Sequence, residues 1–222
     1  MKNKNQKSFI NNLSASPLLF IGIIVLIFGA MIYFSSSDSK SSSYLEDENW
    51  SNSENVKGDE NAPVTMIEYS DYECPACRNS YNMVEEIISE YQGQIKLVHR
   101  HFPLPFNKDA QGASIASECA GEQGKFWEMH EKLNTGKEGL KEKTLKSYAK
   151  EVGIDEKKFS ECFAGNGYLD KINKQKEQGE KDEVNGTPTF FINGKQVINS
   201  GNSKFIPVID DFRNMINAEL EK

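Results

Sequence analysis

The chain has 222 residues, 27% of them charged, and a formal net charge of −7. That length suits one domain with an appendage or two small domains, and it is long enough to bury a real core. The high charged fraction excludes a protein with many membrane spans, and the acidic balance argues against nucleic-acid binding, which requires clustered lysine and arginine.

Residues 1–16 form a short basic arm that contains Lys2, Lys4 and Lys7 and no acidic residue. Residues 17–34 follow without a charged or amide side chain. As a helix this run would span about 27 Å, close to the ~30 Å core of a bilayer. We expect an uncleaved membrane anchor with the lysines in the cytoplasm and the rest of the chain outside the cell membrane. Secretion after signal-peptide cleavage is the alternative, although the apolar run is longer than a usual signal-peptide core.

Residues 35–60 are rich in serine and carry seven acidic residues against two lysines. Because this stretch has few apolar side chains to bury, we expect a disordered linker that keeps the outer domain near the membrane. The globular pattern begins at residue 61. The expected division is therefore an arm at 1–16, an anchor at 17–34, a linker at 35–60 and a folded domain at 61–222.

The folded domain begins with the pattern strand, helix, strand, which is the unit that builds parallel sheets in α/β proteins. A later Asn193-Gly194 pair between two short strand patterns is typical of a hairpin. The expected elements, in chain order, are a strand at 64–69, a helix at 75–91, a strand at 95–102, a mostly helical stretch at 108–180, hairpin strands at 189–193 and 195–199, and a closing helix around 206–216.

The motif Cys74-Pro75-Ala76-Cys77 lies directly after the first strand and opens the first helix. A helix N-terminus has unpaired N–H groups and the positive end of the dipole, so it stabilises a thiolate. Pro75 suits this position because its missing N–H would be unused there. We therefore expect Cys74 to be a reactive thiolate and Cys77 to resolve a mixed disulfide.

A zinc half-site is the alternative interpretation of this Cys-x-x-Cys motif. Structural zinc needs a second pair of ligands nearby, whereas Cys119 and Cys162 lie far along the chain and in no ligand pair. The three histidines, His99, His101 and His130, show no metal-ligand spacing either. We expect no metal and no cofactor.

A second motif, Gly186-Thr187-Pro188-Thr189, comes directly before the expected hairpin. Proline is tolerated at the start of a strand, and a cis peptide bond there would be a deliberate feature. An ordinary trans turn proline is the alternative, and the sequence leaves both isomers open.

Glu68 is the third candidate, because on the first strand it shares a face with Val64 and Met66. If that strand is central, the carboxyl group is buried, its pKa is raised, and it transfers a proton near neutral pH. If Glu68 lies at the strand end, it reaches solvent.

These features together resemble a known family. The carboxylate six residues before the CPxC motif, the helical insertion and the later GTPTFFING segment are similar to the DsbA-like thiol–disulfide oxidoreductases of the thioredoxin fold. The resemblance covers about Pro63 to the C-terminus. It implies a thioredoxin-like α/β fold with a helical insertion at about 108–180, preceded here by one transmembrane helix.

The resemblance also implies roles for the motif residues. Cys74 would be the exposed nucleophile, Cys77 the buried resolving cysteine, Pro188 a cis-proline packed against the active site, and Glu68 the buried acid. Three further positions would contact substrate, the last through its backbone: Pro75, Ala76 and Thr187. Members of the family often carry a second bridge, which would join Cys119 to Cys162 in an oxidising compartment; two buried free thiols are the alternative.

The implied activity is that of a disulfide oxidase, which would act as a monomer on reduced exported proteins. A quinone-linked membrane protein of the DsbB or VKOR type would reoxidise it. Ala76 stands where the best-known oxidases have histidine, which favours a less oxidising potential. Two alternatives remain open: a disulfide isomerase or reductase on the same fold, and a surface-anchored interaction module without enzymatic activity.

Overall fold

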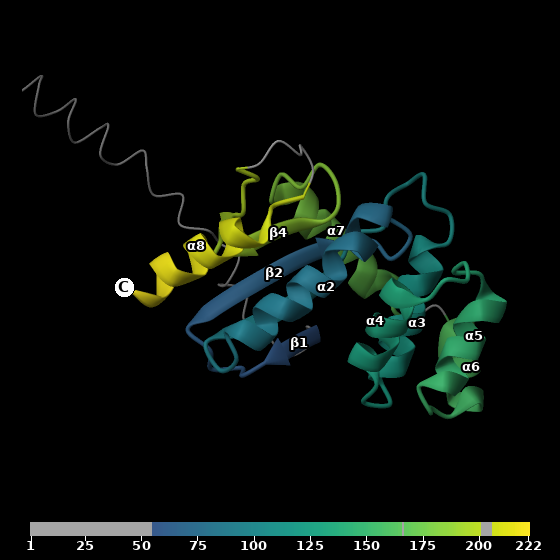
Figure 1. Ribbon diagram of the computed structural model, residues 1–222. Coiled ribbons are helices and arrows are strands. Elements are labelled where there is room, and N and C mark those ends of the chain that lie inside the picture. The colour runs from purple at the N-terminus through teal and green to yellow at the C-terminus, as the bar shows by residue number, and fades with distance from the viewer. Residues whose placement is uncertain (1–54, 166, 201–205) are drawn as a thin grey trace, which may run out of the picture. The chain divides into compact units, whose positions relative to one another are not determined.

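The computed structural model describes residues 55–165, 167–200 and 206–222. The helices and strands of these residues are shown in Figure 1. In chain order they are β1 Asn55–Gly58, β2 Val64–Ser70, α2 Pro75–Glu90, β3 Ile95–His101, α3 Ala110–Gly121, α4 Phe126–Thr135, α5 Glu142–Glu151, α6 Glu156–Ala164, α7 Leu169–Lys181, β4 Thr189–Ile192, β5 Lys195–Gln196 and α8 Ile209–Leu220.

The strands form one sheet in the order β1-β3-β2-β4-β5. β2 and β3 are parallel, as the strand–helix–strand pattern predicts, and the other neighbouring pairs are antiparallel. β2 lies at the centre and is buried along its whole length. The hairpin at Asn193-Gly194 is confirmed, although its second strand ends at Gln196 rather than at residue 199.

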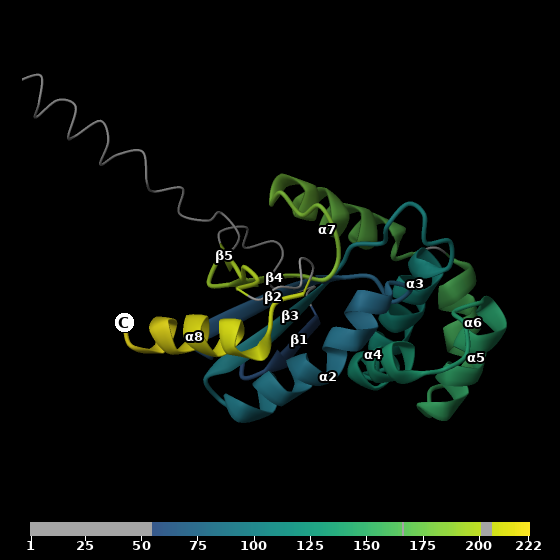
Figure 2. The same ribbon diagram turned by 45° about the horizontal axis from the view of Figure 1, so that its top comes forward.

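Helices cover both faces of this sheet (Figure 2). α2 and α8 pack on the face that carries Val64 and Met66 of β2, whereas α7 packs on the face that carries Ile67 and Tyr69. Gly179 allows the close approach of α7, because a Cβ atom there would lie only 2.7 Å from the ring of Phe102. The central strand is therefore shielded from water on both sides.

The helical insertion has a core of its own. Its helices α3, α4, α5 and α6 lie at one end of the sheet and pack around a row of fully buried alanines in α3. A disulfide between Cys119 and Cys162 joins α3 to α6, which confirms the second bridge that the family resemblance implies. Asp155 caps α6 by accepting hydrogen bonds from two backbone N–H groups.

The predicted linker is wrong at its C-terminal end, because Asn55–Gly58 form β1 at the edge of the sheet. β1 pairs antiparallel with β3, and the indole N–H of Trp127 donates a hydrogen bond to the Val56 carbonyl at 3.0 Å. Lys57 and Glu85 add an ion pair at 2.6 Å. Pairing and side-chain contacts hold this strand, so its low apolar content is misleading.

None of the helices within the described ranges is long and apolar enough to cross a membrane. The predicted arm at 1–16, the anchor at 17–34 and residues 35–54 of the predicted linker lie outside those ranges. The anchor therefore stays a prediction from the sequence.

Candidate active site

The Cys-x-x-Cys motif lies where the sequence predicts it. α2 begins at Pro75, and Cys74 is the N-cap residue with an extended backbone. The side chains of both cysteines are free thiols. Cys77 is 1% exposed and Cys74 is 8% exposed. The expected order of exposure is confirmed, but Cys74 is far more covered than the exposed nucleophile that the family resemblance implies.

The covering group comes from the other end of the domain. The Thr187 carbonyl oxygen lies 3.4 Å from Cys74 Sγ, across 113 residues of sequence, and accepts a hydrogen bond from it when Cys74 is protonated. Because β4 pairs with β2, the loop before β4 lies beside the start of α2. The Thr187–Pro188 peptide bond is cis, as the resemblance implies, and Pro188 is buried.

The two thiols have opposite acidities. A hydrogen bond from the Cys77 thiol, reinforced by the backbone N–H groups of Cys77 and Ala76, lowers the pKa of Cys74 from an ordinary value of 9.0 to about 5 although burial opposes the shift. Burial raises the pKa of Cys77 well above its ordinary range. At neutral pH Cys74 is therefore a thiolate and Cys77 a thiol that donates to it.

The two residues between the cysteines, Pro75 and Ala76, form part of the surface around the thiols. Pro75 is exposed and Ala76 is half-buried. Both lie in the first turn of α2, beside the sulfur of Cys74. A partner that reaches this sulfur would therefore meet the CPxC turn on one side and the Thr187 carbonyl on the other.

Sequence reasoning missed Asp71, which organises the loop before α2. Its buried carboxylate accepts hydrogen bonds from the backbone N–H groups of Glu73 at 2.7 Å and Leu104 at 2.8 Å, and from the Asn107 side chain at 2.8 Å. Its own N–H lies 3.5 Å from Cys77 Sγ. An aspartate that accepts from the backbone two residues later is a usual turn signal, and it could have been recognised in the sequence.

Glu68 is buried, so the alternative in which it reaches solvent is wrong. The residue is 4% exposed, and its strand position lies between His99 of β3 and Phe190 of β4. One carboxylate oxygen lies 3.8 Å from Nδ1 of His99. Glu68 is therefore buried, as the family resemblance implies.

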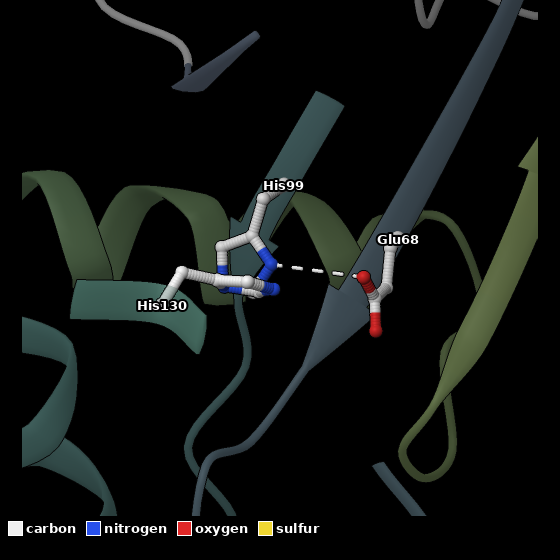
Figure 3. A group of neighbouring side chains, drawn as sticks. All are labelled: Glu68, His99 and His130. Carbon is white, nitrogen blue, oxygen red and sulfur yellow. Dashed lines mark ion pairs between the residues drawn. The ribbon is translucent and has the colours of Figure 1, made fainter. Parts of the chain in front are cut away.

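His99 and His130 lie beside Glu68, although the spacing of the histidines gives no sign of this (Figure 3). The three residues come from β3, α4 and β2 and offer ligand atoms that all lie within 4.8 Å of one another. Tyr72 stacks on His99 and its hydroxyl lies 3.0 Å from Nδ1 of His130. Because the three elements are distant in sequence, only the fold could reveal this cluster.

Comparisons with known proteins agree with this geometry. The sequence model of the family described as thioredoxin matches residues 51–211. Among solved structures, BdbD from Bacillus subtilis in its oxidised form is 26% identical, with a TM-score of 0.65 over 76% of this chain and 94% of that one. A thioredoxin-like oxidoreductase from Silicibacter pomeroyi is 23% identical, with a TM-score of 0.67 over 76% and 93% of the two chains.

Curated relatives match over a shorter stretch. The Na⁺/H⁺ antiporter NhaA 3 of Salinispora tropica is 38% identical over 144 residues, which are 64% of this chain and 22% of that protein. The chain thus spans less than a quarter of the length of this relative. The family match across most of the chain, the cis-proline beside the CPxC helix and the buried acid on the central strand agree, and the chain therefore belongs to the thioredoxin family as a DsbA-like member.

Proposed function

We propose that this protein is an extracytoplasmic thiol–disulfide oxidoreductase that introduces disulfides into exported proteins. The observation that carries the proposal is the lowered pKa of Cys74, about 5, next to a resolving thiol whose pKa is raised. An acidic nucleophile paired with a buried partner is the arrangement that dithiol–disulfide exchange requires.

In the reaction, the oxidised protein holds a bond between Cys74 and Cys77. A client thiolate attacks Cys74 Sγ, the Cys74–Cys77 bond breaks, and a mixed disulfide forms between the client and Cys74. A second client thiolate then attacks the client sulfur, and Cys74 leaves as a thiolate. The client has lost two electrons and formed one disulfide, while Cys74 and Cys77 hold those two electrons as reduced sulfurs.

Glu68 would act at Cys77, the buried cysteine of this exchange. The pKa of Cys77 is raised by burial, so its sulfur needs a proton when the bond to Cys74 breaks. We assign that proton to Glu68, a carboxyl group buried on the strand that leads into the active-site loop. The Thr187 carbonyl and the exposed Pro75 would orient the client at Cys74.

The stabilised thiolate favours the oxidase direction. The pKa of Cys74 falls from 9.0 to about 5. A thiol is protonated below its pKa, so at pH 7 only the part of this shift that lies below pH 7, about two pKa units, stabilises the reduced form. This corresponds to about 3 kcal/mol, or about 60 mV of reduction potential for a two-electron couple. A protein whose reduced form is stabilised gives up its disulfide readily to clients.

Location and partners follow from the same proposal. The Cys119–Cys162 disulfide supports an oxidising compartment, and the apolar run at 17–34 supports attachment to the cell membrane. After each turnover a membrane thiol oxidase linked to quinone, of the DsbB or VKOR type, would take the two electrons.

Protease treatment of intact cells tests the location, since an outward-facing domain is degraded without lysis.

The decisive experiment combines a redox titration with an oxidation assay. Equilibration in glutathione buffers should give a reduction potential well above the value of about −270 mV that is typical of the reductant thioredoxin. The full chain should oxidise a reduced client, and the Cys74→Ser variant should not. Cys77→Ser cannot form the Cys74–Cys77 bond and should not oxidise the reduced client either, but its Cys74 should accumulate a mixed disulfide with a client that already holds a disulfide.

Each outcome separates the alternatives. A potential near that of thioredoxin would contradict the oxidase direction and favour a reductase. Rearrangement of scrambled disulfides without net oxidation would favour an isomerase. Unchanged client oxidation in Cys74→Ser would leave only a non-enzymatic interaction module.

A further inference from the structure

The cluster around Glu68 contains an imidazole without a hydrogen-bond partner. His99 is fully buried, and neither of its ring nitrogens has a hydrogen-bond partner among the residues that the structure describes. The Glu68 carboxylate lies 3.8 Å from its Nδ1. A buried polar group without a partner costs free energy and calls for an explanation in terms of an ion or another ligand. The ring of His130, also buried, lies with its centroid 4.7 Å from that of His99.

We propose that Glu68, His99 and His130 form a buried site for a divalent transition-metal ion of the Zn²⁺ type. Two imidazole nitrogens and one carboxylate oxygen are a ligand set that suits zinc and its neighbours, whereas Mg²⁺ and Ca²⁺ prefer oxygen ligands alone. The thiol chemistry proposed above uses Glu68 but neither His99 nor His130, so an ion bound here would hold the carboxylate that otherwise supplies the proton to Cys77.

The distances fit such an ion after a small closure. Since the three ligand atoms lie within 4.8 Å of one another, a point exists within about 2.8 Å of all of them. Zinc binds nitrogen and oxygen at about 2.0–2.2 Å, so each side chain must move inward by about 0.6–0.8 Å. Figure 3 shows a nitrogen of the His99 ring facing the Glu68 carboxylate, with the ring of His130 overlapping that of His99 in this view.

The residues around the cluster provide polar groups that can orient a metal-binding histidine ring. Nδ1 of His130 lies 3.0 Å from the Tyr72 hydroxyl, and Nε2 lies 3.2 Å from the Asn134 amide. Whichever nitrogen binds the ion, the other therefore keeps a polar neighbour that orients the ring.

His101 provides a matched control. It is a buried histidine on β3, like His99, but one of its ring nitrogens already has a hydrogen-bond partner. Its Nε2 lies 2.9 Å from the Glu118 carboxylate, and it is not part of the three-residue cluster. A glutamine at this position keeps a group that hydrogen-bonds Glu118. Removal of His101 should therefore leave the proposed site intact.

The test uses the full chain in detergent with its cysteines oxidised, so that no thiolate competes for the ion. Calorimetric titration with Zn²⁺ should show one ion per chain, and Co²⁺ should give the visible spectrum of a nitrogen and oxygen site without sulfur. His99→Phe and Glu68→Gln should each weaken binding by more than about 100-fold, while His101→Gln should bind Zn²⁺ like the parent. Zinc should also raise the melting temperature of the parent and not that of His99→Phe.

Three results would overturn the proposal. They are no Zn²⁺ binding to the oxidised parent, binding that survives both His99→Phe and Glu68→Gln, and a loss in His101→Gln as large as that in His99→Phe. Glu68→Gln preserves the shape of the side chain, so it decides the matter if His99→Phe does not fold. No client is present in these measurements, and their outcome is independent of the oxidase assay.

Discussion

Replacing Cys77 by alanine should make the Cys74 thiol less acidic while leaving it in place. The hydrogen bond from Cys77 is the largest cause of the lowered pKa of Cys74. A hydrogen bond to a charged group contributes about 1.5–3 kcal/mol, which equals about 1–2 pKa units at 1.36 kcal/mol per unit. Because the backbone N–H groups of the helix remain, we expect the pKa of Cys74 to rise from about 5 to about 6–7.

Thiolate absorbance and the rate of alkylation by iodoacetamide, followed between about pH 3 and pH 9, measure this pKa. Cys74 is the only titrating thiol in the described part of this variant, since Cys119 and Cys162 are joined. Cys77→Ser is the matched control, because its hydroxyl still donates, and its midpoint should stay close to 5. Equal midpoints in the two variants would refute the assignment to the Cys77 thiol, and a parent midpoint near 9 would refute the stabilised thiolate itself.

Two further predictions concern stability. Replacing Cys119 and Cys162 together by serine opens a bridge across 43 residues, so the free energy of unfolding should fall by about 4 kcal/mol in urea denaturation; a loss below about 1 kcal/mol would contradict the chain-entropy account. Gly179→Ala should destabilise the protein by about 1–3 kcal/mol in thermal unfolding, because the new Cβ would lie 2.7 Å from Phe102. Its control is Gly112→Ala, whose nearest neighbours lie at an ordinary 3.8 Å and which should be neutral or stabilising by up to about 1 kcal/mol. Equal effects of the two alanines would show that helix propensity, not crowding, decides both.

The parts of this protein that short sequence patterns specify were predictable. An apolar run with β propensity gives the central strand, and a proline after Cys74 starts α2 where the thiol needs the helix N-terminus. The burial of Glu68 follows once its strand is central, since helices cover both faces of the sheet. The strand and the start of α2 depend on residues close together in the chain, whereas the burial of Glu68, which the sequence leaves open, also needs α7 and α8 from much later in the chain.

The parts that failed depend on contacts between distant residues. Cys74 is covered by a carbonyl that arrives 113 residues later, so no local pattern gives its exposure. The cluster of Glu68, His99 and His130 joins two strands and a helix of the insertion, and metal-ligand spacing rules apply only to neighbours in sequence. β1 escapes a local pattern because it is short, has one large apolar side chain and pairs with β3, a strand distant in the sequence.

β1 also has a protective role at the margin of the sheet. Among the described residues β1 is the strand beside β3 on the side away from β2, so a fragment that starts at residue 61 would lose the partners of those backbone groups of Lys96–His99 that face β1. Such an open strand edge invites pairing with a second molecule. Shortened versions that retain Asn55–Gly58 should therefore stay monodisperse in light scattering, whereas those cut after Gly58 should self-associate.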